Sequence, residues 1–102
     1  MSQYYSPFKI NDDSTTTNVA YYQNVSLTSG AVSTSTAITA RRILITNGTA
    51  PTFVAFGPAP VVSATTGFQL PANSAMIFNF ESGNKVAAIS GSNNLISILD
   101  LD

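Results

Sequence analysis

Carboxylates are the residues of this chain with the most potential for acid–base chemistry, and they are few and scattered. The 102-residue sequence has five, at Asp12, Asp13, Glu81, Asp100 and Asp102. A glycosidase needs two carboxyl groups that face each other across a cleft, whereas these lie in a polar N-terminal stretch, in an expected turn and at the C-terminus. The chain also lacks His and Cys, which removes the commonest general base and the thiol nucleophile. We therefore predict that the protein is not an enzyme.

Metal and cofactor sites are disfavoured by the same composition. Zinc, copper and haem sites draw on His and Cys ligands, and the chain has neither. The stretch Asn11-Asp12-Asp13-Ser14 offers oxygen atoms to Ca²⁺, but it lacks the spaced acids and the fixed glycine of a calcium-binding loop. We interpret it as a solvated linker, and we expect neither a metal nor a cofactor.

Charge is sparse, which narrows the choice of partners. The formal net charge is −1, with four Lys and Arg residues in the whole chain, so the basic surface of a nucleic-acid-binding domain is missing. The pair Arg41-Arg42 either contacts an acidic partner or discourages edge-to-edge pairing at the start of a strand. No apolar run approaches the roughly 20 residues of a membrane span, and Met1–Tyr5 does not resemble a signal peptide. We expect synthesis in a cytoplasm and no contact with membranes.

Short runs of alternating apolar and polar residues are separated by turn signals about every ten residues, a pattern typical of an all-β sandwich. No segment has the periodicity of a long helix. We predict an antiparallel β-sandwich of seven or eight short strands over residues 18–102, preceded by an extended arm over residues 1–17. The expected strands are 19–27, a weak edge strand at 31–38, 42–46, 52–56, 75–80, 85–90 and 95–101.

Two local patterns give sharper expectations. Asn47-Gly48 is a strong turn signal, so we predict that strands 42–46 and 52–56 pair as a hairpin. Met76, Phe78 and Phe80 alternate with smaller or more polar residues, so we expect these three side chains in the core.

The last expected strand is apolar on both faces, with Leu95, Leu99 and Leu101 on one and Ile96 and Ile98 on the other. A sandwich core covers one face of a strand, so the second face needs another cover. Tyrosine also favours interfaces, because it brings a large contact area at low entropic cost. The residues that we predict at a partner interface are Tyr4, Tyr5, Phe8, Tyr22, Arg41, Arg42, Ile96 and Ile98.

Several strand and turn segments resemble small structural proteins of tailed-bacteriophage virions. The similarity is carried by residues 42–49, 52–57, 70–74 and 85–91 and by the closing Leu95-Ile96-Ser97-Ile98. Proteins of this kind serve as cement or decoration proteins of the capsid. The resemblance implies a jelly-roll-like sandwich without enzymatic activity on the capsid surface. The implied partners are the major capsid protein and further copies of the chain, as a dimer or trimer.

Two other classes of protein share the expected fold. A carbohydrate-binding or adhesive module, such as a phage fibre domain, would bind glycans through exposed Tyr or Phe side chains. A pilus or cell-surface subunit would carry a signal peptide, which we do not find at this N-terminus.

Overall fold

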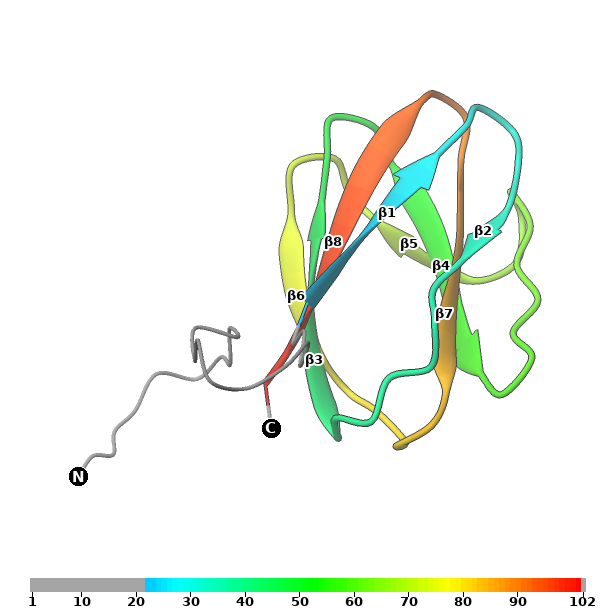
Figure 1. The fold of residues 1–102 in the computed structure, drawn as a ribbon. Helices are drawn as coiled ribbons and strands as arrows, with labels where there is room; N and C mark the ends of the chain where they lie inside the picture. The colour runs from blue at the N-terminus through cyan, green and yellow to red at the C-terminus, as the bar shows by residue number, and fades with distance from the viewer. Residues whose placement is uncertain (1–21, 102) are drawn as a thin grey trace.

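The computed structural model describes residues 22–101, which form two antiparallel sheets packed face to face (Figure 1). Every element of this region is a β-strand, and no helix interrupts them. The eight strands are β1 (Tyr22–Leu27), β2 (Ser33–Thr34), β3 (Arg42–Asn47), β4 (Thr52–Gly57), β5 (Phe68–Leu70), β6 (Ala75–Asn79), β7 (Lys85–Ser90) and β8 (Asn94–Asp100). The prediction of an all-β sandwich is confirmed. The boundary predicted between residues 17 and 18 lies outside the described residues.

The two sheets have a nested strand order. Sheet A is ordered β1-β8-β3-β6, and sheet B is ordered β2-β7-β4-β5. Strand β1 pairs with β8, β2 with β7, β3 with β6 and β4 with β5, each pair antiparallel. Each pair therefore encloses the next along the chain, so the chain is one long two-stranded ribbon folded over a core.

The core lies between the sheets and is built from the inward side of each strand. Ile43, Ile45, Ile96 and Ile98 of sheet A are fully buried. They belong to one cluster with side chains from sheet B, among them Val54, Leu70, Val86 and Ala88. Because side chains alternate between the faces of a strand, this cluster fixes which residues face outward.

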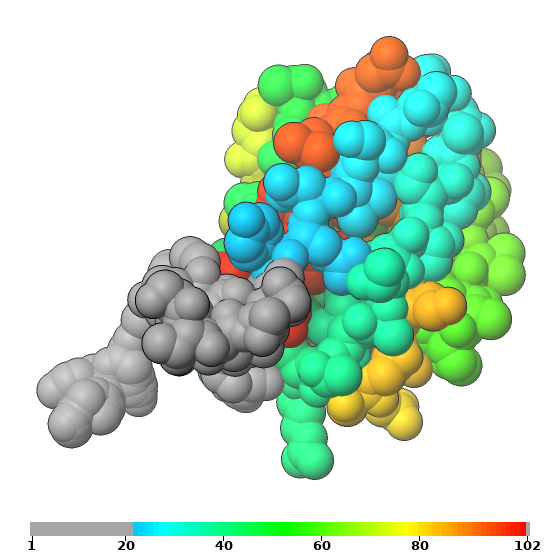
Figure 2. Space-filling view, in the orientation of Figure 1, coloured from blue at the N-terminus to red at the C-terminus, as the bar shows by residue number. Residues whose placement is uncertain are grey.

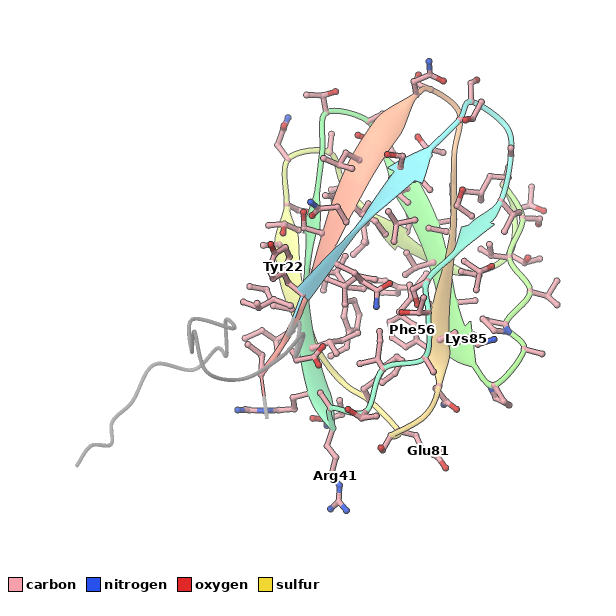
Figure 3. The ribbon with its side chains drawn as sticks, viewed as in Figure 1. Tyr22, Arg41, Phe56, Glu81 and Lys85 are labelled. Carbon is pink, nitrogen blue, oxygen red and sulfur yellow. The ribbon has the colours of Figure 1, made fainter. Side chains whose placement is uncertain are left out.

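Three phenylalanines extend the core toward one end. The Phe56 ring points between the sheets (Figure 3) and meets the rings of Phe78 and Phe80 edge to face, at centroid distances of 5.1 and 5.3 Å. Phe80 is buried, whereas Met76 and Phe78 are half-buried and pack against the core. The expectation that these residues line the core is thus confirmed, with Met76 and Phe78 at its margin.

Both open sides of the sandwich are closed by side chains of its edge strands. On one side, Gln23 of β1 accepts the Thr36 backbone N–H at 3.1 Å, and the Ser33 hydroxyl of β2 donates to the Ser26 carbonyl at 3.2 Å. Figure 2 shows the surface running without a gap from β1 to the 31–40 segment on this side. On the other side, the rings of Phe68 and Phe78 lie 5.8 Å apart.

Most predicted strands are present within a residue or two, and the exceptions have local causes. The expected edge strand 31–38 is reduced to β2, because the Ser35 hydroxyl accepts the Val86 N–H at 2.9 Å in place of a backbone carbonyl. Strand β5 was not expected. Residues 19–21 of the first predicted strand lie outside the described region.

The predicted hairpin between residues 42–46 and 52–56 is wrong. Strands β3 and β4 lie in different sheets, and the chain crosses between the sheets at Asn47–Pro51. Asn47 is buried there, and its amide nitrogen donates to the carbonyls of Ala50, Leu70 and Pro71. At the crossing, these backbone carbonyls are therefore hydrogen-bonded by a side chain. In a hairpin, they would be bonded by the backbone N–H groups of a neighbouring strand.

The assignment of Ile96 and Ile98 to a partner interface is also wrong. Both side chains are fully buried in the core, so they are not available to a partner. Leu95 and Leu99 occupy the outward side of β8 instead, with Leu95 47% exposed. The side of β8 with Ile96 and Ile98 faces inward, because in the strand register Ile96 pairs with Val25 and Ile98 with Ile45, which are both buried in the core.

Candidate interaction surface

The outward face of sheet A is a regular surface built from four strands. Alternation along the four strands places twelve side chains on it, which together we call face A. Face A consists of Tyr22, Asn24, Ser26, Arg42, Leu44, Thr46, Ala75, Ile77, Asn79, Leu95, Ser97 and Leu99. Figure 3 shows the Tyr22 side chain on this side of the molecule and Lys85 on the side of sheet B.

Four large apolar side chains form a continuous row across face A. Tyr22 pairs with Leu99, Leu99 with Leu44, and Leu44 with Ile77 in the strand register. The row crosses all four strands, about 14 Å at the usual spacing between strands. Tyr22 and Ile77, at its ends, are 51% and 58% exposed, and the two leucines between them are half-buried. We call these four residues the apolar row.

Mostly polar side chains flank the apolar row. Asn24, Ser97, Thr46 and Ala75 form the neighbouring register row, in which the Ser97 hydroxyl donates to the Asn24 side-chain oxygen at 2.7 Å. On the other side of the apolar row, Arg42 pairs with Asn79. Arg42 carries the one charge among the twelve side chains of face A. An apolar centre with a polar rim is the usual anatomy of a protein–protein contact.

Sheet B presents a different outer side. Ala87 faces outward yet is fully buried, and Val62 of the β4–β5 connection is buried too, although neither belongs to the main core cluster. Figure 1 shows this connection on the outside of sheet B. At one end of this side lies a pocket of about 290 Å³ whose walls, including Phe53, Ile89 and Pro51, are almost entirely apolar.

The structure brings two of the residues predicted at an interface onto face A and separates the others. Tyr22 ends the apolar row, and Arg42 lies beside it. Arg41 is exposed at one end of the sandwich, near Glu81 (Figure 3), where both line a shallow depression. Tyr4, Tyr5 and Phe8 lie outside the described residues.

Sequence reasoning missed Leu44, Leu99 and Ile77 as members of a surface. Each lies in a strand whose apolar residues occupy both faces, so no single strand pattern marks them. Only the register of four strands that are distant in sequence brings them into one row.

The acidic groups of the described region do not converge. Glu81 lies beside Arg41, whereas Asp100 lines a separate small depression with Tyr22, Gln23 and Thr36. Within residues 22–101 there is no group of three or more His, Cys, Asp or Glu side chains able to hold a metal ion. That region also has no helix long and apolar enough to cross a membrane. Face A therefore remains the candidate functional site.

Comparison of the chain with models of known protein families, with curated protein sequences and with solved structures finds no match.

Proposed function

We propose that the protein is a structural component of a bacteriophage virion that binds the outside of the capsid and stabilises it by bridging neighbouring subunits. The observation that carries this proposal is the apolar row on face A. Exposed apolar side chains with a mostly polar rim favour contact with other proteins. The strand and turn segments that resemble phage virion proteins supply the choice of the major capsid protein as partner.

The strand order supports the same class of protein. Eight strands in two sheets, with four nested antiparallel pairs, fit a jelly roll, and we infer that the sandwich has this topology. Jelly rolls are common in viral capsid proteins. Many unrelated functions use this fold, so the topology supports the proposal without deciding it.

The direct test is co-sedimentation of the purified full chain with capsids of the phage that encodes it. We expect the chain to pellet with the capsids and to raise their melting temperature, because a ligand that binds only the assembled shell stabilises it by mass action. Absence of binding at 100 µM chain would overturn the proposal.

Two variants locate the contact. Deletion of residues 2–10, which removes Tyr4, Tyr5 and Phe8, should weaken capsid binding while the circular dichroism of the sandwich stays unchanged. Ile77→Ser removes an exposed apolar side chain from face A and should weaken binding, whether face A contacts the capsid itself or another bound copy of the chain. Val61→Ser is the matched control, because Val61 is 85% exposed and lies on the β4–β5 connection. If the deletion leaves binding unchanged, the N-terminal residues have no part in attachment.

The alternative function, a glycan-binding adhesive module, is favoured by the two half-exposed aromatic rings of Tyr22 and Phe68. Aromatic faces of this kind stack on sugars. A glycan array screened with the full chain distinguishes the two proposals. A hit that is lost in Tyr22→Ala or Phe68→Ala, together with no binding to capsids, would place the glycan function first.

A further inference from the structure

We infer that face A is a two-fold interface with a second copy of this chain, in which the apolar row of each copy packs against the other. This inference rests on the proposed function, because it names the contact through which copies of a capsid-bridging protein would bind one another. Its test needs no capsid.

Charge favours an identical partner. Eleven of the twelve side chains of face A are uncharged, so two copies of the face meet with almost no like-charge repulsion. The face also offers no cluster of charges with which to select an acidic or a basic partner. A contact between two copies needs no such cluster of charges, because it uses the same patch on both copies.

The position of Arg42 on face A favours one direction of the two-fold axis. Arg42 lies two residues from Leu44 along β3, on one side of the apolar row. An axis parallel to the strands would bring the two Arg42 backbones to within about 11 Å of each other, for sheets about 10 Å apart. An axis parallel to the row places them on opposite sides of it, about 17 Å apart, where the repulsion between the two charges is weaker.

In the arrangement with the axis along the row, each apolar residue faces its own copy. Each Arg42 then faces Thr46 and its polar neighbours on the other copy. A guanidinium group donates well to hydroxyl and amide oxygens, so the polar rim accommodates this charge.

The size of face A sets the expected strength of the contact. Four strands spaced at about 4.8 Å, with about six residues each, give a face of roughly 400 Å², or about 800 Å² for both copies. This is below the roughly 1,200 Å² of standard stable interfaces. We therefore expect a concentration-dependent dimer with a Kd on the order of 10 µM to 1 mM. Such an equilibrium shifts toward the dimer when copies are held close together on a shell.

Sedimentation equilibrium of the full chain between 10 µM and 1 mM tests the inference. We expect a monomer–dimer equilibrium in this range. Ile77→Ser should weaken dimerisation at least tenfold, and Val61→Ser should leave it unchanged. A chain that remains monomeric at 1 mM, or a dimer that is equally stable in Ile77→Ser, overturns the inference.

A charge variant tests the direction of the axis. With the axis along the row, Thr46→Glu places a carboxylate opposite Arg42 of the other copy and should tighten dimerisation about two- to fivefold at low salt. With the axis along the strands, the two glutamates would face each other, so a weaker dimer overturns the arrangement. Thr46→Gln controls for side-chain size.

The failure of this inference and of the proposed function can be told apart. A monomeric chain that still pellets with capsids refutes the dimer and leaves the proposed function standing. A chain that dimerises with the expected response to Ile77→Ser, but does not bind capsids, refutes the proposed function and leaves the dimer standing.

Discussion

The side-chain amide of Asn94 donates to the side-chain oxygen of Asn47 over 3.0 Å, at the end of the sandwich where the chain crosses from sheet A to sheet B. The same Asn47 oxygen accepts the Thr52 hydroxyl at 2.9 Å. Asn94 also donates to the Ala50 carbonyl and to the Thr52 hydroxyl oxygen. The two amides therefore join β3 and β8 of one sheet to β4 of the other.

Replacing Asn47 should destabilise the protein strongly. Asn47→Ala leaves the Asn94 amide and the carbonyls of Ala50, Leu70 and Pro71 without this partner, in a part-buried position. We expect a loss of about 2–4 kcal/mol in the free energy of unfolding, measured with urea, because each buried polar group left unpaired costs about 1–3 kcal/mol. Asn79→Ala, on the exposed side of β6, should change it by less than about 0.5 kcal/mol. Equal effects of the two variants would contradict a structural role for the Asn47 amide.

Gly48 should not tolerate even a methyl group. A Cβ atom there would collide with the Asn94 side-chain oxygen and lie 2.9 Å from the Leu95 carbonyl oxygen. We expect Gly48→Ala to lower the melting temperature, at a cost of about 1–3 kcal/mol from overpacking. Gly91→Ala is the matched control, because a Cβ at Gly91 meets nothing within 4 Å. A Gly48→Ala protein that melts with the parent would show that the Asn94 side chain moves aside freely.

Adjacent residues of β8 should respond very differently to truncation. Ile96→Ala empties a fully buried position and should cost about 2–5 kcal/mol. Leu95→Ala removes a side chain that is 47% exposed and should cost less than about 1 kcal/mol. Chemical denaturation of the two variants measures this contrast, and a larger loss for Leu95→Ala would reverse the assignment of inward and outward faces.

The edge-to-face contacts of Phe78 should be detectable against a control that keeps most of its apolar volume. Phe78→Ala loses contacts with Phe56 and Phe68, and we expect a cost of about 3 kcal/mol, at the low end for phenylalanine because Phe78 is half-buried. Phe78→Leu should cost about 1–2 kcal/mol, since it loses mainly the aromatic geometry. Calorimetric unfolding of both variants provides the comparison, and identical stabilities of Phe78→Ala and the parent would place Phe78 outside the core.

Local sequence patterns were sufficient to predict most of the strands but not their arrangement. β7 has the predicted limits, 85–90, because a short apolar run between two turn signals defines it. The faces of β8 were exchanged, because leucines and isoleucines alternate there and alternation alone does not show which set is buried. Asn47-Gly48 correctly marked the end of a strand, but a turn signal does not reveal whether the next strand joins the same sheet.

The candidate site depends on register, which is the least local property of a sheet. Tyr22 was predicted at an interface because it is a tyrosine, but its pairing with Leu99 joins residues at opposite ends of the described region. The apolar row of face A exists only because β1, β8, β3 and β6 lie side by side in this order.

The pairing of β1 with β8 also constrains how the protein is made. The last strand forms the interior of sheet A between β1 and β3, so sheet A cannot assemble until the ribosome has delivered residues 94–100. Contacts this distant along the chain slow folding, because the loop that they close is long. A nascent chain that stops short of β8 therefore lacks the centre of sheet A, and the subunit should become competent to associate in one late step after synthesis.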